Sequence, residues 1–151
     1  TCQFEYNDKI KDRTQFDFYI KDGEIEVFFE IKYTENCFGG ASSSDSAKKQ
    51  YKNWYEEQFK QQQCLKDIPA NIDDFISNYT QYYQLYRNAI RITDKNKHLI
   101  LLYPKNNTTV NKEATTFLEN KIREEYRGNI HILHWEDIVK EGKLYEKYFA
   151  E

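Results

Sequence analysis

Two carboxylates and a lysine stand in two neighbouring apolar segments of the chain, at a spacing that could support chemistry. Asp17 interrupts the first segment, and Glu30 and Lys32 are close together in the second. Two adjacent carboxylates suit Mg²⁺, which binds one or two carboxylates, keeps several waters and accepts phosphate oxygens as its other ligands. A lysine beside such an ion can orient a water molecule or stabilise developing negative charge. These residue types are therefore suited to metal-assisted hydrolysis of a phosphodiester, if the fold brings them together.

A β-hairpin is the element that must position these side chains. Asp22-Gly23 lies between the two segments and is the strongest short hairpin signal in the sequence. If these two residues form the loop, Asp17 stands opposite Phe28, and Glu30 is its diagonal neighbour at roughly 7–8 Å. Because side chains alternate along a strand, Asp17, Glu30 and Lys32 then share one polar face. A three-residue loop would break this parity.

The other face of the hairpin is wholly apolar, which predicts that it faces the core. It carries Phe16, Phe18, Ile20, Ile25, Val27, Phe29 and Ile31. The polar face permits a second interpretation, because a solvated hairpin without any ligand would also display Glu and Lys. Glu-x-Lys recurs at Glu119-Asn-Lys121 and Glu141-Gly-Lys143, so the spacing alone leaves both interpretations open.

The order of the predicted elements indicates an α/β fold. Three strands come first and two helices follow, after which strands and helices alternate to the end of the chain. The predicted strands span 2–6, 14–21, 24–34, 98–103 and 130–135, and the predicted helices span 45–63, 72–92 and 110–126, with short helices at the end. We expect a mixed sheet that starts with a β-hairpin meander and is flanked by helices. The Gly- and Ser-rich segment at 38–46 is expected to be a mobile loop.

Composition bounds the class of protein. A chain of 151 residues with 17% aromatic residues can bury one core, so we expect a single domain over 1–151. The chain has no methionine, so we expect that its true start lies upstream and that an N-terminal helix of the domain is missing from these residues. No apolar run approaches the ~20 residues of a bilayer crossing, and no signal peptide is visible. The three cysteines show no metal-binding or disulfide pattern, so free thiols in the cytoplasm are expected.

The segments around the acidic residues resemble the PD-(D/E)XK nuclease superfamily. The resemblance rests on Gln15-Phe16-Asp17-Phe18-Tyr19-Ile20, on Phe29-Glu30-Ile31-Lys32-Tyr33-Thr34-Glu35 and on Phe38-Gly39. The order of elements extends it to about Tyr103, and the sequence is most similar to restriction-endonuclease-like bacterial proteins of poorly defined role. Phe16 stands where the name-giving proline would be, a position that the superfamily varies. The helix that often precedes the first strand of the superfamily is not in this chain.

The resemblance implies an Mg²⁺-dependent deoxyribonuclease with a restriction-endonuclease-like fold, in which Mn²⁺ can replace Mg²⁺. It implies that Asp17 and Glu30 bind the metal together with the backbone carbonyl of Ile31, and that Lys32 is the catalytic lysine. Lys32→Ala is then expected to abolish cleavage and to leave the fold intact, because Lys32 lies on the polar face. The alternative is a non-catalytic module on the same fold that binds nucleic acid or a protein.

Polar residues on the second predicted helix extend the candidate site. Gln84, Arg87, Asn88 and Arg91 recur at helical spacing, apart from the apolar face of that helix. The segment 84–88 resembles the polar helix beside the active site in relatives of the superfamily, where a glutamine contacts the substrate or the site. Gln84, Arg87 and Asn88 are therefore candidate substrate-binding residues, whereas an ordinary solvated position is expected for Arg91.

DNA is the expected partner. The net charge of −3 gives no overall attraction to nucleic acid, but basic residues cluster locally on and after the first two helices, as a modest phosphate-binding groove would require. No membrane association is expected. A homodimer is left open, because cutting both strands with one site each would require two copies. His131 and His134 stand at i and i+3 on a predicted strand and therefore predict no shared metal.

Overall fold

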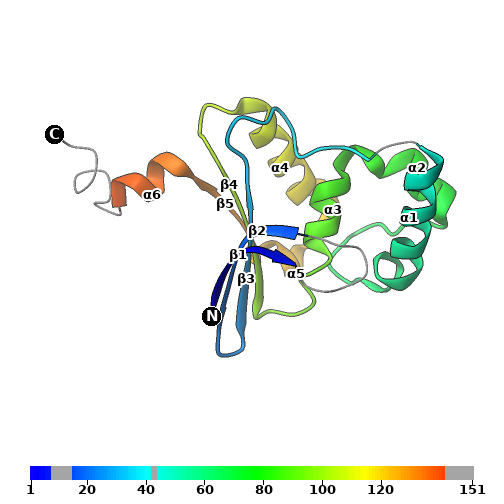
Figure 1. Cartoon of the computed structure of the whole chain (residues 1–151), viewed down its shortest axis with the longest axis horizontal. Coiled ribbons are helices and arrows are strands. Elements are labelled where there is room, and N and C mark those ends of the chain that lie inside the picture. Colours follow the sequence, from blue (N-terminus) through cyan, green and yellow to red (C-terminus); the bar gives the residue numbers. More distant parts are fainter. Residues whose placement is uncertain (8–14, 42–43, 142–151) are drawn as a thin grey trace.

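The computed structural model describes residues 1–7, 15–41 and 44–141, and its strands form one mixed five-stranded sheet (Figure 1). The strands lie in chain order, and the first three pair antiparallel, whereas β3–β4 and β4–β5 pair parallel. They are β1 (Cys2–Asn7), β2 (Gln15–Asp22), β3 (Ile25–Ile31), β4 (Lys97–Tyr103) and β5 (Ile130–His134). The sheet is flanked by helices, so the expected mixed α/β fold is confirmed.

The long helices expected from the sequence are divided. The helical elements are α1 (Asp45–Glu57), a 3-10 turn (Phe59–Gln61), α2 (Ile72–Asn78), a 3-10 turn (Thr80–Tyr82), α3 (Tyr83–Ala89), α4 (Thr108–Lys121), α5 (Glu124–Arg127) and α6 (Trp135–Glu141). At two of the breaks, backbone groups bond to residues outside the helix. The Thr80 carbonyl accepts the Ala41 N–H at 2.9 Å, and Ile122, which is extended, forms a β-bridge with Leu65. In the described part of the chain, no helix has both the length and the apolar character needed to cross a membrane.

The helices α1–α5 lie on one side of the sheet, and α6 projects on the other (Figure 1). The core fills the space between the sheet and that helical layer. From the sheet come buried side chains such as Tyr19, Phe28, Leu99 and Leu101, and from the helical layer come Trp54, Phe59, Phe75, Leu85 and Tyr86. Ring contacts join Trp54, Phe59 and Phe75 to one another at centroid distances between 5.1 and 5.4 Å. Large aromatic side chains thus contribute much of the buried area of this core.

The hairpin register differs from the prediction by two residues. Asp22 pairs with Ile25, so the two-residue loop is Gly23-Glu24 rather than Asp22-Gly23. Gly23 takes the first central position with φ of 58°, where a II′ hairpin turn favours glycine. A shift of two preserves the parity of the strands, so the paired side chains from Phe18 to Phe29 keep their predicted grouping into two faces. Extended one step beyond the Phe18–Phe29 pair, the register places Asp17 opposite Glu30, rather than diagonal to it.

The prediction of which hairpin face is buried is wrong, with the exception of Phe16. The helical layer covers the face of Tyr19, Phe28, Glu30 and Lys32, and all four side chains are buried. Phe16 joins that face because the β1–β2 ladder is interrupted between the Phe4–Phe18 and Tyr6–Phe16 pairs, where Glu5 has φ of 49°.

The second surface of the sheet, on the side away from α1–α5, is called the open face below. Its side chains are half-buried or exposed except that of Leu102, which is 4% exposed, although the hairpin part of this face is expected from the sequence to be core. It carries Cys2, Phe4, Phe18, Ile20, Asp22, Ile25, Val27, Phe29, Ile31, His98, Ile100, Leu102, His131 and Leu133.

Candidate active site

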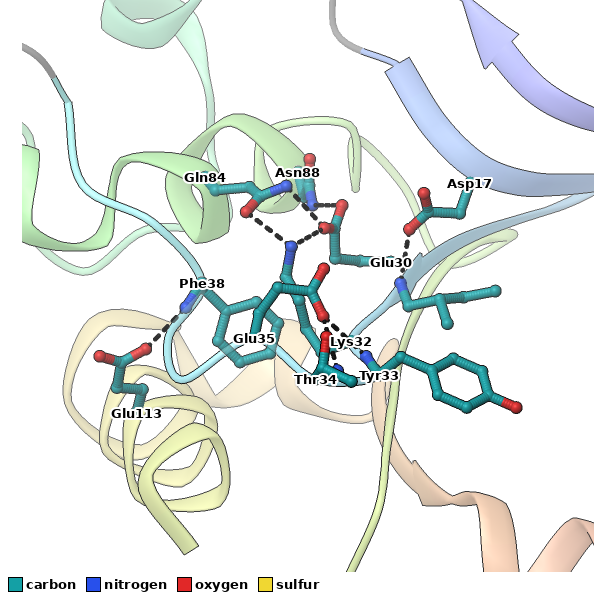
Figure 2. A network of polar contacts seen from close by, with 11 residues as sticks. Asp17, Glu30, Lys32, Tyr33, Thr34, Glu35, Phe38, Gln84, Asn88 and Glu113 are labelled. Carbon is teal, nitrogen blue, oxygen red and sulfur yellow. Dashed lines mark hydrogen bonds and ion pairs between the residues drawn. The ribbon is translucent and has the colours of Figure 1, made fainter. Parts of the chain in front are cut away.

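A buried ion pair lies at the C-terminal end of β3, beneath the helical layer (Figure 2). Nζ of Lys32 is 2.7 Å from Oε1 of Glu30, and the two residues are 7% and 2% exposed. Burial raises the pKa of the Glu30 carboxyl, although Lys32 and Asn88 oppose that rise. The expectation that Lys32 lies on a solvated polar face is therefore wrong: the polar patch is inside the molecule.

Two amides of α3 satisfy this pair. Nε2 of Gln84 donates to Oε1 of Glu30 at 2.6 Å, and Oε1 of the same amide accepts from Nζ of Lys32 at 3.0 Å. Nδ2 of Asn88 donates to Oε2 of Glu30 at 2.8 Å. Gln84 and Asn88 are one helical turn apart, so both reach down onto the same carboxylate (Figure 2). A buried charge is tolerable only with such partners, which gives these amides a clear physical role.

Asp17 approaches the same strand from β2. Its Oδ2 accepts the backbone N–H of Ile31 at 2.7 Å, just beyond the last β2–β3 pair, so the carboxylate takes the place of a strand carbonyl (Figure 2). The side chain of Asp17 is exposed, unlike that of Glu30. The structure thus brings Asp17, Glu30, Ile31 and Lys32 together at one end of the hairpin.

The loop after β3 packs against the ion pair and is held there by contacts with Lys32 and α4. Phe38 is 1% exposed, its ring centroid lies 5.8 Å from Nζ of Lys32, and its backbone N–H donates to Glu113 of α4 at 2.9 Å. Gly39 has φ of 80° and would place a Cβ 3.6 Å from the Gln84 amide oxygen, so the backbone passes close to the network. Residues 42–43 lie outside the described residues, but the part up to Ala41 is packed rather than loose. Sequence reasoning missed Glu113, because a helix residue 75 positions away gives no local signal.

The two arginines of the predicted polar stripe lie apart from this network. The guanidinium of Arg87 lies over the ring of Tyr83, 5.3 Å from its centroid. Arg91 is 7% exposed and donates to the side-chain oxygen of Gln58 at 2.7 Å, so the expectation of a solvated Arg91 is wrong. Of the predicted stripe, Gln84 and Asn88 are the members that meet Glu30.

The acceptor capacity of the two carboxylates bears on metal binding. Oε1 of Glu30 already accepts from Gln84 and pairs with Lys32, whereas Oε2 accepts one bond, from Asn88. Each carboxylate oxygen offers about two lone-pair positions, so one oxygen of Glu30 retains capacity, as does the carboxylate of Asp17. Within the described ranges, no group of three or more His, Cys, Asp and Glu side chains could hold a metal. A metal here would depend on two carboxylates, backbone and water, which is a ligand set typical of Mg²⁺.

A model of the family described as "restriction endonuclease associating with ARP" matches residues 1–150. The chain belongs to this family. The description of the REase-ARP family indicates a restriction-endonuclease-like role. No curated protein and no solved structure matches the chain.

Proposed function

We propose that this member of the REase-ARP family is a metal-dependent nuclease that hydrolyses phosphodiester bonds of DNA. One observation carries the proposal: a buried glutamate and lysine, 2.7 Å apart, are held by two helix amides beside a second acid, the exposed Asp17 on the neighbouring strand. Burying two charges costs free energy that an apolar pair would not cost. A fold that retains them together with a complete set of partners is well suited to use them, and the PD-(D/E)XK resemblance of the same residues adds to this argument.

Asp17 and Glu30 would hold the metal, together with the backbone carbonyl of Ile31. The N–H of Ile31 points toward Asp17, and the N–H and carbonyl of one strand residue point toward the same neighbouring strand. That carbonyl is therefore directed to the side from which Asp17 approaches. When bound, Mg²⁺ or Mn²⁺ would supply Lewis-acid stabilisation of the phosphate and a lowered pKa of bound water.

Lys32 and the polar side chains of α3 have different roles in this proposal. Lys32 places an ammonium group beside the acids, where it orients the attacking water and offsets negative charge that develops on the phosphate. Asn88 is 2% exposed and bonds to Glu30, so it positions that carboxylate. Gln84 is half-buried and bonds to both charged side chains. Gln84 and Arg87, which are on the same helix, are the candidates for contact with the DNA.

The test is cleavage of plasmid and of single-stranded DNA with Mg²⁺ or Mn²⁺, compared between wild type and three variants. Asp17→Asn removes an exposed acid, so it should leave the fold intact and abolish cutting. Lys32→Met should also abolish cutting, with circular dichroism showing that the variant is folded. Lys21→Met is the matched control, because Lys21 pairs with Glu26 at 3.4 Å on the same hairpin but is exposed. Full cutting by Lys32→Met would contradict the assignment.

The second candidate is a non-catalytic module on the same fold. It is favoured by the ion pair itself, because Lys32 occupies one oxygen of Glu30, and by the absence of a three-side-chain metal cluster in the described ranges. Metal-dependent cutting that Asp17→Asn removes would exclude this candidate. Binding of DNA without cutting in either metal, unchanged in Asp17→Asn, would favour it over the nuclease.

A further inference from the structure

The open face is an unusual surface for a protein in water. Phe4 is 78% exposed on β1, Ile25 is 51% exposed on β3, and Leu133 is 37% exposed on β5, so apolar groups are displayed from one edge of the sheet to the other. In a chain that is 31% charged, the described residues of this face include one charged side chain, Asp22, which stands opposite Ile25 at the hairpin end of the sheet. Contiguous apolar patches of this kind mark interaction sites.

Two histidines of this face, His98 and His131, contact each other. Nδ1 of His98 and Nε2 of His131 are 3.1 Å apart, and the two rings stack with centroids 5.3 Å apart. Burial and the neighbouring His98 lower the pKa of His131, which favours the uncharged form of that ring.

We propose that the open face is the interface through which two copies of this chain pair. A mainly apolar face is self-complementary, since a two-fold axis brings each side chain against the same surface and opposes few like charges. Interfaces of obligate homodimers have this composition, like a domain core cut in half. The face is poorly suited to nucleic acid, because its described residues include no Lys or Arg to meet a phosphate.

The dimensions of the face agree with a stable dimer. Five strands at about 4.8 Å spacing and about 3.3 Å per residue form a surface roughly 20 Å on a side. The relief of its aromatic and branched side chains brings the accessible area toward the ~800 Å² per partner of a standard interface. Two such sheets would pack face to face about 10 Å apart, as in a β-sandwich.

This arrangement leaves the candidate active site free. Glu30 and Lys32 are buried on the helix-covered side of the sheet, whereas Phe4 and Ile25 are exposed. The helix α6 projects on the side of the open face (Figure 1). Pairing would therefore place the two sites on the outer sides of the dimer. The proposal does not depend on the nuclease activity.

The test measures the molar mass of the 151-residue chain in solution, by light scattering and by analytical sedimentation at micromolar concentration. Wild type should show twice the 18.3 kDa of one chain. Phe4→Glu and Leu133→Glu alter exposed positions, so each should stay folded and weaken dimerisation by about 100-fold or more, since each dimer would bury two unpaired charges. Ile68→Glu is the matched control, because Ile68 is 38% exposed, like Leu133, but lies away from the sheet.

A dimer that is lost in Phe4→Glu and Leu133→Glu and kept in Ile68→Glu supports the interface. A wild-type chain that is monomeric up to high micromolar concentration overturns it, as does a dimer that both sheet variants retain. A monomer whose melting temperature falls when residues 142–151 are removed also overturns it, because the chain itself would then cover the face. Equal loss of the dimer in all three variants would equally contradict the assignment to this face.

Discussion

Nζ of Lys32 and Oε1 of Glu30 are 2.7 Å apart, and both side chains are more than nine-tenths buried. Such a pair is held in place by its surroundings rather than by its own attraction, because desolvation of the two charges offsets most of their Coulomb energy. Gln84 touches both members, and Asn88 touches the acid. The site is therefore a network in which each partner depends on the others.

Lys32→Ala should lower the free energy of unfolding as well as the activity. Removal of one member of a buried pair leaves an uncompensated charge, at a cost of about 3–5 kcal/mol. This replaces the expectation from sequence that the variant leaves the fold intact. Urea denaturation measures the change. Lys21→Ala, which breaks the exposed pair with Glu26, should cost no more than ~1 kcal/mol, and equal losses in the two variants would argue against a buried Lys32.

Asn88→Ala should destabilise the protein through a lost hydrogen bond. The amide of Asn88 is buried, and its loss removes a donor from a desolvated carboxylate oxygen, at about 1–3 kcal/mol. The comparison is Asn78→Ala on α2, where Asn78 donates to Asp74 at 2.7 Å on an exposed surface. That control should change the unfolding free energy by less than ~0.5 kcal/mol. If Asn88→Ala behaves like the control, Asn88 does not support Glu30.

The three thiols should react at two very different rates. Cys2 and Cys37 are exposed, whereas Cys64 is buried, bonds to the Ala89 carbonyl at 3.1 Å and has a pKa raised by burial to about 12. Only the thiolate is nucleophilic, so a disulfide reagent at pH 8 should titrate Cys2 and Cys37 quickly and Cys64 only after denaturation. A Cys64→Ala variant should keep the whole fast phase. Equal reactivity of all thiols in the native protein would contradict the buried position of Cys64.

His131 should make the protein less stable at acidic pH. Partial burial and His98 lower its pKa in the folded state, so the unfolded chain binds the proton more readily. Stability from this group is complete above the unfolded pKa of about 6.5 and is lost as the pH falls from there toward the folded value. Melting temperatures at pH 7.5 and pH 5.5 measure the effect. His131→Asn should reduce the difference between the two temperatures, and His134→Asn should not.

The sequence by itself determined the order of strands and helices and the grouping of the three candidate residues. Glu30 and Lys32 fell on one strand face because side-chain alternation is local, and a register shift of two residues left Asp17 at the same end of the hairpin. The hairpin was also predictable, since Gly23 marks a turn through its backbone freedom alone.

Only the tertiary structure decided which face of the sheet is buried and which residues complete the site. Both faces of the hairpin carry enough apolar groups to form a core, so the choice depended on where α1–α5 pack. Gln84 and Asn88 meet Glu30 across 54 and 58 residues of chain, and Glu113 meets the loop across 75. Periodicity cannot report such contacts, because they arise from the packing of whole layers, and this packing converted an apparently solvated Glu-x-Lys pattern into a buried, fully bonded pair.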